Sequence, residues 1–227
     1  MTPNLLANIS WHSLNGSHAR YSSGTKVARR YARGFSPIIG FADVERPDFS
    51  ALAPYCDLGE HFYCGGWSGP APAGWQIEAD SSAWQLIWAG QLPDAQETPG
   101  VVRMGAEHLT AMLELVTMTQ PGPFAERTIE LGEYYGIFEA GRLVAMAGER
   151  FEVAQLKEIS TVCTHPDFRG RGLARRLVEH LLHRALARGQ MPFLHVMREN
   201  DAAGRIYERM GFHRVQEFAV RVVSRVT

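Results

Sequence analysis

The sequence predicts an α/β (α+β) fold: a mixed β-sheet with helices on both faces, preceded by a smaller α/β domain. Two observations lead to this prediction. After residue 98, apolar runs of strand length alternate with segments whose apolar residues recur at helical spacing, in the order β-α-β-β-β-α-β-α-β. Before residue 98, short strand-like runs rich in Trp and Tyr surround one helical segment.

The first part of the chain contains one predicted helix, near Asp48–Tyr55, and several predicted strands. These strands are 35–41, 61–64, 75–79 and 84–88. "GGWSGPAPAG" (65–74) is a Gly/Pro-rich loop, and "GQLPDAQETPG" (90–100) is polar and broken by prolines, as in a linker. We therefore predict an N-terminal domain over residues 1–98, in which no catalytic pattern is visible, and a second domain over residues 99–227.

The second part of the chain has clearer periodicity. "YYGIFEAGRLVAMAGERF" predicts a hairpin that turns at Ala140-Gly141, where glycine accepts a positive φ easily. "KEISTVCTH" predicts a strand that ends before Pro166, which cannot donate to a sheet ladder. The other predicted elements are a strand at 101–104, a helix at 105–119, a helix at 172–188, a strand at 191–197, a helix at 201–210 and a strand at 212–223.

Composition excludes several classes of protein. The formal net charge of -1 argues against general binding of nucleic acid or an anionic membrane. No stretch reaches the roughly 18 apolar residues needed to span a bilayer, and the start does not resemble an export signal. Cys56, Cys64 and Cys163 have neither disulfide-framework nor zinc-ligand spacing, so we expect reduced thiols, no metal and a cytoplasmic protein.

The stretch "RGRGLA" predicts an anion site at the start of a helix. The first backbone N–H groups of a helix lack partners, and the macrodipole places positive charge there. Gly170 and Gly172 leave these groups uncovered, and Arg169, Arg171 and Arg175 could add charge for a polyphosphate. Neither a P-loop nor a dinucleotide-binding fingerprint fits the spacing. A flexible turn with solvated arginines is the alternative.

Two motifs carry a resemblance to a known family. Arg169, Gly172 and Ala174 match the pattern Q/R-x-x-G-x-G/A, and "NDAAGRIYERMGF" matches N-x-x-A-x-x-x-Y-x-x-x-G-F. Over residues 101–223 the chain resembles the GNAT acyltransferase superfamily. It looks like the glycine N-acyltransferase-like branch, in which a degenerate GNAT-like half comes first.

The resemblance implies a splayed sheet and a binding site for acyl-coenzyme A. In this family one strand bends away from its neighbour and leaves a V-shaped gap for the pantetheine arm. That arm would pair here with the main chain of Val162, Cys163 and Thr164, and Asn200 would make a polar contact. The pyrophosphate would rest on the amides of Arg169, Gly170, Arg171, Gly172, Leu173 and Ala174.

Acyl transfer to an amine needs a base for the ammonium and an acid for the departing thiolate. By resemblance Tyr207 is the acid, although a core aromatic residue is the alternative. Glu158, at the start of the splayed strand, is the predicted base, and Glu149 is its competitor. His165 has a suitable pKa, but we expect a structural histidine there.

The sequence therefore predicts an N-acyltransferase that moves an acetyl or other acyl group from acetyl-coenzyme A to a small amine or amino-acid-like acceptor, by direct attack on the thioester. Cys163 is not expected to be a nucleophile, because no base is identified beside it. "QPGPF" (120–124) is predicted to form a loop over the acceptor pocket. A non-catalytic module that binds acyl-coenzyme A is the alternative, and a homodimer is compatible with the sequence.

Overall fold

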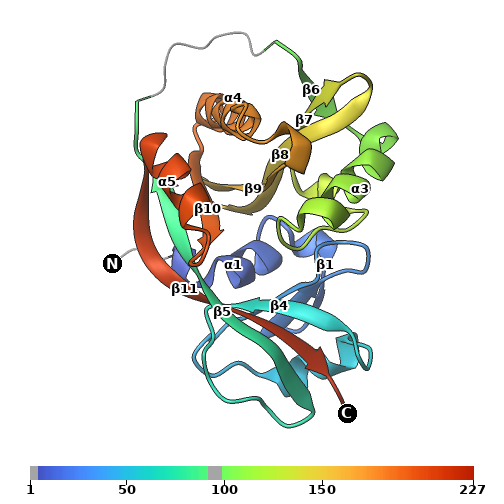
Figure 1. Ribbon diagram of the computed structural model, residues 1–227. Helices are drawn as coiled ribbons and strands as arrows, with labels where there is room; N and C mark the ends of the chain where they lie inside the picture. Colours follow the sequence, from blue (N-terminus) through green and yellow to red (C-terminus); the bar gives the residue numbers. More distant parts are fainter. Residues whose placement is uncertain (1–4, 92–98) are drawn as a thin grey trace.

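The computed structural model describes residues 5–91 and 99–227, which form one continuous sheet with helices on both faces (Figure 1). The strand order is β1-β2-β3-β4-β11-β5-β10-β9-β8-β7-β6. The β3–β4 and β9–β10 pairs are parallel and the other pairs are antiparallel. The predicted mixed α/β sheet is confirmed.

Two long strands join the two parts of the chain. β5 (Trp75–Trp88) and β11 (Phe212–Arg225) run side by side along the molecule (Figure 1). β11 also pairs with β4 (His61–Gly65), and β5 pairs with β10 (Met191–Met197). Strands of both predicted domains thus belong to one sheet. Residues 92–98, which include most of the predicted linker, lie outside the described residues, and the division at residue 98 stays a prediction.

The prediction of two strands over residues 75–88 is wrong, because β5 is unbroken. The polar residues near its centre suggested a break between two strands. Hydrogen bonds with β11 satisfy the polar groups of these side chains instead. Ser81 Oγ donates to the carbonyl of Val220 at 3.0 Å, and Arg221 Nη2 donates to Asp80 at 2.7 Å. Periodicity also missed α1 (Ile9–Asn15), β1 (Ser22–Gly24) and β2 (Ala28–Tyr31).

The other predicted elements near the N-terminus are present with shifted ends. β3 covers Ile38–Phe41, and Asp48 caps α2 (Phe49–Leu52), which continues as a 3-10 turn at Ala53–Tyr55. Asp48 Oδ1 accepts a hydrogen bond from the backbone N–H of Ala51 at 2.9 Å. A short side chain that satisfies an open N–H group is the usual way to start a helix.

The predicted elements of the second part of the chain are confirmed. They are β6 (Val101–Met104), α3 (Leu109–Thr119), β7 (Tyr134–Glu139), β8 (Arg142–Val153), β9 (Leu156–Thr164), α4 (Leu173–Ala187), β10, α5 (Asp201–Arg209) and β11. β7 and β8 form the expected hairpin. Its turn residues Ala140 and Gly141 have φ of 49° and 78°, as a tight two-residue turn requires.

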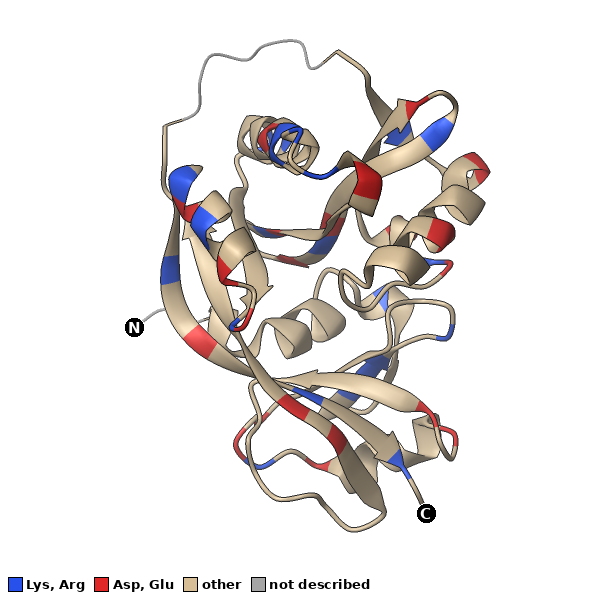
Figure 2. Ribbon diagram, in the orientation of Figure 1, with Lys and Arg blue, Asp and Glu red and all other residues tan. Residues whose placement is uncertain are grey.

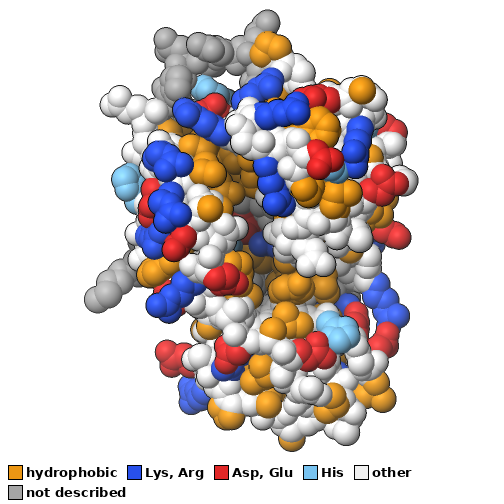
Figure 3. Space-filling view, in the orientation of Figure 1, with side chains coloured by type: hydrophobic (Ala, Val, Ile, Leu, Met, Phe, Trp, Pro, Cys, Tyr) orange, Lys and Arg blue, Asp and Glu red, His pale blue; other side chains and the backbone are white. Residues whose placement is uncertain are grey.

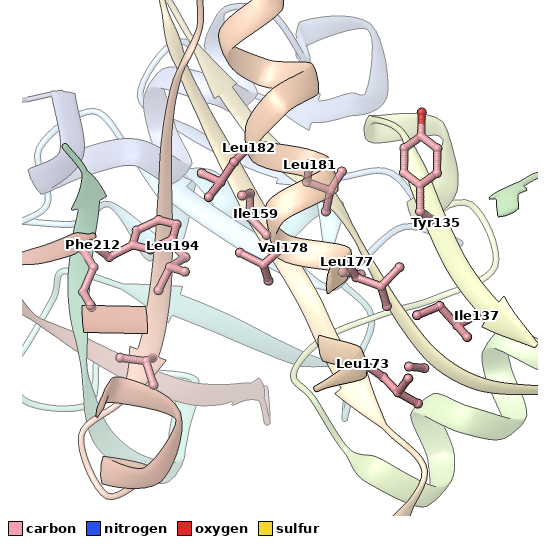
Figure 4. Close-up of a cluster of buried hydrophobic side chains, with 14 of the residues drawn as sticks. Tyr135, Ile137, Ile159, Leu173, Leu177, Val178, Leu181, Leu182, Leu194 and Phe212 are labelled. Atoms are coloured by element: carbon pink, nitrogen blue, oxygen red, sulfur yellow. The ribbon is translucent and has the colours of Figure 1, made fainter. Parts of the chain in front are cut away.

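Helix α4 covers one face of the sheet through an apolar stripe. Leu173, Leu177, Val178, Leu181 and Leu182 point towards side chains of β7, β9 and β10 (Figure 4). Each of them is at most 5% exposed, and their recurrence after three or four residues keeps them on one side of the helix. Helix α5 packs on the same cluster through Ala203, Tyr207 and Met210.

Helices α1 and α3 cover the opposite face. Ile9 and Leu14 of α1 pack against Phe151, Leu156 and Phe193. Met112 and Leu115 of α3 join a separate cluster that contains Tyr134, Met146 and Cys163. Because α1 and α3 meet different parts of this face, side chains of β8 and β9 lie between the two clusters.

Candidate functional site

The sheet opens between β9 and β10. These strands pair only at Leu156–Met191, Lys157–Pro192 and Glu158–Phe193, and beyond the last pair they separate. The rest of β9 remains paired with β8 on its other edge. The splayed geometry of the predicted fold is therefore confirmed, and the edge of β9 that faces β10 keeps unpaired backbone groups.

A bulge reshapes β9 just inside this gap. The register with β8 shifts between Ser160 and Cys163, and Thr161 has φ of 55°, a left-handed value that is unfavourable for a residue with a branched side chain. A bulge leaves an extra residue unpaired and redirects the strand. Val162 and Cys163 follow this bulge, on the part of β9 that is not paired with β10.

A mostly apolar pocket lies where the gap meets α4 and α5. Its lining includes Val162, Cys163, Thr164, Ala174 and Tyr207, five of the predicted site residues. Arg175, which was expected to add charge for a polyphosphate, also lines the pocket, and the remaining lining residues, Val178, Ala203, Ile206 and Met210, were not predicted as site residues. The spacing of 203, 206, 207 and 210 on one helix face was the signal that could have found those of α5.

The loop before α4 has the features of an anion cradle. Gly170 and Gly172 have φ of 77° and 74°, and a Cβ atom at either position would meet no atom within 4 Å. Gly172 is the residue immediately before α4, a helix of 15 residues, so this open space adjoins the end of the helix where the first N–H groups lack intrahelical partners. Neighbouring Leu173 is buried, which anchors the start of the helix to the core.

The arginines beside this loop have intramolecular partners. Arg171 lies 3.2 Å from Glu139, and Arg175 lies 2.7 Å from Glu179. Arg169 Nε is 3.5 Å from the carbonyl of Thr164, and Arg176 donates to the carbonyl of Pro99. Exposed ion pairs contribute only about 0–1 kcal/mol, so these side chains can exchange their partners for a phosphate at low cost. Figure 2 shows basic residues in this loop and on α5.

Two titratable side chains of the pocket are protonated at neutral pH. Burial raises the pKa of the Tyr207 phenol to about 12 and that of the Cys163 thiol to about 11. The ring of Tyr207 lies 5.9 Å from that of Phe212 in an edge-on arrangement. A phenol in this state can donate a proton, and a thiol with a raised pKa is a poor nucleophile.

Asn200 caps helix α5. Its Oδ1 accepts a hydrogen bond from the N–H of Ala203 at 3.2 Å, and the residue is exposed. This contact accounts for an asparagine at this position without a ligand. The predicted contact of Asn200 with a cofactor stays a prediction.

Glu158 lies on the sheet face opposite α4. Its oxygens accept hydrogen bonds from Arg150 Nε at 2.9 Å and Nη2 at 2.8 Å, from the N–H of Phe151 at 3.2 Å, and from His195 Nδ1 at 2.7 Å. Burial alone would raise the pKa of this carboxyl, but the Arg150 charge and the His195 contact hold it well below its usual range. Both oxygens are engaged, so these contacts give no support to Glu158 as the base, and that role stays a prediction.

The ring of His195 is fixed by a row of polar side chains across the sheet. Gln85 Nε2 donates to the carbonyl of Leu6 at 3.0 Å, and Gln85 Oε1 accepts from Gln216 at 2.6 Å, which sets the orientation of the amide. The same Nε2 lies 2.8 Å from His195 Nε2, which must therefore be the acceptor. His195 carries its proton on Nδ1, towards Glu158. No local pattern in the sequence indicates this row.

The two other residues considered as bases are also engaged. Glu149 is 2% exposed, pairs with Arg188 and lies 3.6 Å from Lys157. His165 is 4% exposed, and its two nitrogens contact Arg142 at 2.6 Å and the N–H of Asp167 at 3.2 Å. These contacts are those of a structural histidine, as expected.

The "QPGPF" segment follows α3 and contacts the N-terminal part of the chain. Gln120 ends α3 with φ of 46°, and Ser36 Oγ donates to the carbonyl of Pro123 at 2.8 Å. The ring of Phe124 packs on Tyr134 at 5.6 Å. A role of this loop in acceptor specificity stays a prediction.

Two general features of the described residues bear on the expected partners. In residues 5–91 and 99–227, no three His, Cys, Asp or Glu side chains come together as a metal site would require. None of the helices described has the length and apolar character to cross a membrane. The three cysteines are free thiols.

Comparison with known proteins points to one family. Residues 134–222 match the family described as FR47-like protein. A crystal structure from Novosphingobium aromaticivorans, described as that of a GNAT family member, superposes with a TM-score of 0.89 and 31% identity over 98% of this chain and 99% of that one. A GCN5-related N-acetyltransferase from Kribbella flavida has the same fold, with a TM-score of 0.62 and 18% identity over 98% and 96% of the two chains.

The curated relatives match only part of their length. The chain is 38% identical over 89 residues to the N-alpha-acetyltransferase RimI of Mycobacterium tuberculosis, which is 36% of this chain and 52% of that protein. It therefore spans about half of this relative. None of the relatives named here is a glycine N-acyltransferase, so that narrower branch stays a prediction.

Proposed function

The chain belongs to the GNAT family of acetyltransferases, and we propose that it transfers an acetyl group from acetyl-coenzyme A to the amine of a small, amino-acid-like acceptor. The observation that carries this proposal is the pocket at the mouth of the β9–β10 gap, where five predicted site residues meet.

The loop and the strand edge fit the two ends of the co-substrate. The N–H groups at the start of α4 and the open space at Gly170 and Gly172 suit a pyrophosphate. The unpaired edge of β9 at Val162 and Cys163 suits an extended arm with amide groups, which would add to the sheet as a strand does. Acetyl-coenzyme A supplies the thioester, and the chain supplies the binding and the proton donor.

Tyr207 is the proposed acid. It lines the pocket, and burial keeps its phenol protonated at neutral pH. Protonation of the departing thiolate by a positioned side chain typically contributes about 10²- to 10⁴-fold to a rate. Glu158 stays the proposed base. Because its oxygens accept hydrogen bonds from Arg150, it is proposed to take the proton of the acceptor's ammonium through a water molecule.

Coenzyme A release from acetyl-coenzyme A, measured with a panel of small amines, tests the proposal. Wild-type protein should release coenzyme A with at least one amine, and Tyr207→Phe should lower kcat by about 10²-fold or more with little change in coenzyme A affinity. Calorimetry with coenzyme A provides the binding control.

A second function is the non-catalytic module that holds acyl-coenzyme A as a ligand. The observation that favours it is the engagement of Glu158, Glu149 and His165, which leaves none of the predicted bases free. Tight coenzyme A binding with no release across the amine panel would establish this alternative and refute the enzyme.

A further inference from the structure

The side chain of His195 lies where the sheet begins to open. Phe193 forms the last backbone pair of β10 with β9, opposite Glu158, and His195 is the next residue of β10 on the same face. Leu194, between them, points to the other face, into the cluster under α4 (Figure 4). The side chain of His195 is 14% exposed and that of Glu158 is 1% exposed. His195 is therefore the more accessible partner of a buried carboxylate at the closed end of the gap.

The carboxylate of Glu158 accepts two hydrogen bonds at each oxygen. Oε1 accepts from Arg150 Nη2 and His195 Nδ1, and Oε2 accepts from Arg150 Nε and the N–H of Phe151. A carboxylate has about four acceptor sites, so a water molecule can bind only in exchange for one of these donors. The two bonds from Arg150 come from a charged group, and the N–H of Phe151 belongs to the backbone of β8. The contact with the uncharged ring of His195 is the one that exchanges at least cost.

Gln85 opposes a second proton on this ring. Its Nε2 lies 2.8 Å from His195 Nε2 and also donates to the carbonyl of Leu6, while its Oε1 accepts from Gln216. A proton on His195 Nε2 would point at the N–H groups of this amide, and reversal of the amide would break both other hydrogen bonds. Gln85 is 0% exposed, so bulk water does not replace bonds that are lost there. The amide therefore favours a ring with a proton on Nδ1 alone.

The remaining surroundings of the ring contain one group that favours a second proton. The negative charge of Glu158 at Nδ1 favours an imidazolium, whereas the positive charge of Arg150, bound to the same carboxylate, opposes it. Aromatic rings pack around the imidazole from β8, β10 and β11, with centroid distances of 6.4, 5.7 and 5.2 Å for Phe151, Phe193 and Phe218. The charge of His195 thus depends on the balance between Glu158 on one side and Gln85 with Arg150 on the other.

The N-terminal part of the chain supplies this control. Gln85 is on β5, directly opposite His195 in the pairing of β5 with β10, and the carbonyl of Leu6 lies before α1. The sequence shows no catalytic pattern in this part of the chain. Figure 3 shows a hollow in the middle of the molecule, in the region between β10 and α1, with acidic and basic side chains at its floor. Water can approach this face of the sheet through the hollow.

We propose that Gln85 keeps the ring of His195 uncharged, so that the hydrogen bond from His195 to Glu158 Oε1 can give way to the water that delivers the acceptor's proton. The ammonium loses one proton to this water, the water passes one proton to Oε1, and the ring keeps its own proton on Nδ1. An imidazolium would hold Oε1 by a charge-assisted bond and keep the water out. Gln85 and His195 are thus positioning residues, and their role rests on the proposed function.

The pH dependence of Gln85→Met tests the inference. This variant has no amide to oppose a second proton, so the ring should become charged as the pH falls through the ordinary range of histidine, about 6–7. The kcat for coenzyme A release, taken as a ratio to wild type, should fall about 10-fold between about pH 8 and pH 6. Protonation of the acceptor amine affects both proteins alike and cancels in this ratio. A ratio that stays constant with pH would indicate a purely structural glutamine and overturn the inference.

A double variant provides the matched control. His195→Asn keeps an uncharged donor near the position of Nδ1 but cannot take up a proton in this range. Gln85→Met combined with His195→Asn loses the same hydrogen bond to Leu6 as the single variant, and its ratio to His195→Asn should be constant with pH. A ratio that still falls would show that another group titrates, which also overturns the inference. Circular dichroism checks that each variant is folded.

NMR of the wild-type protein tests the charge of the ring without a reaction. In protein with ¹⁵N-labelled histidine, coupling to an attached proton shows which ring nitrogens are protonated, and His195→Asn assigns the signal. Wild type should carry a proton on Nδ1 alone at pH 7, and Gln85→Met should gain one on Nε2 as the pH is lowered. A wild-type ring with two protons would overturn this inference and leave the proposed function standing. Absence of coenzyme A release by wild type with every amine would instead refute the proposed function, whatever the NMR result.

Discussion

Arg150 holds Glu158 through two parallel hydrogen bonds, Nε to Oε2 at 2.9 Å and Nη2 to Oε1 at 2.8 Å, on the sheet face opposite α4. The pair is almost completely buried, with side-chain exposures of 11% and 1%. A carboxylate held by two hydrogen bonds from a guanidinium is a weak base, because these bonds stabilise its charged form. The pair therefore bears on stability as well as on the site.

Replacement of Glu158 should destabilise the protein strongly. Glu158→Gln leaves the buried Arg150 without its counter-charge, and loss of one partner of a buried pair typically costs about 3–5 kcal/mol. The matched control is Glu130→Gln, because Glu130 also accepts two hydrogen bonds from an arginine, Arg127, but at the surface. The control should cost less than about 1 kcal/mol. Urea denaturation measures both, and equal effects would contradict the special role of burial.

Glu133 should make stability depend on pH in the acid range. Hydrogen bonds from Arg184, helped by the charges of Arg188 and Arg103, lower the pKa of Glu133 to about 2. A group whose pKa is lower in the folded state adds stability above its unfolded pKa of about 4.5, and this contribution is lost as the pH falls towards 2.

The comparison of wild type with Glu133→Gln isolates this contribution. The difference in unfolding free energy should be about 1–2 kcal/mol at pH 7 after allowance for screening by solvent, and it should shrink between pH 4.5 and 2. Exposed Glu126, replaced by Gln, is the control. A difference that stays constant over this range would show that the charge of Glu133 does not act on stability.

The anion cradle can be tested at Gly172. Gly172→Glu places a negative side chain in the open space before α4 and should abolish coenzyme A binding with the fold intact. Gly172→Ala is the matched control, because it carries the same cost of a left-handed φ, about 1–2 kcal/mol, without the charge. Calorimetry measures affinity and circular dichroism measures the fold. Unchanged affinity in the Glu variant would defeat the assignment of this loop to the phosphates.

The three thiols should be unreactive in the folded protein at neutral pH. Burial raises the pKa of Cys163 and Cys56 to about 11, and that of Cys64 to about 12. Iodoacetamide reacts with the thiolate, so native protein at pH 7.5 should show almost no labelling in a mass spectrum, and denatured protein should show three adducts. Rapid labelling of native Cys163 would reopen its role as a nucleophile.

The local parts of the site could be predicted from the sequence. The helix start at "RGRGLA", the hairpin at Ala140-Gly141 and the motif that contains Tyr207 each depend on residues close together in the chain, where φ preference and helical spacing act directly. The order of elements after residue 100 follows from the same periodicity. These features determine the fold class and carry the resemblance to the family.

Only the tertiary structure decided which distant side chains meet. The pairing of β5 with β11 turned two expected strands into one, since a partner strand satisfies the polar residues at its centre. Packing decided that Glu158 is held by Arg150 and His195, which lie on two other strands of the sheet. Burial and partners are properties of the packed molecule, so spacing along the chain carries no signal for them.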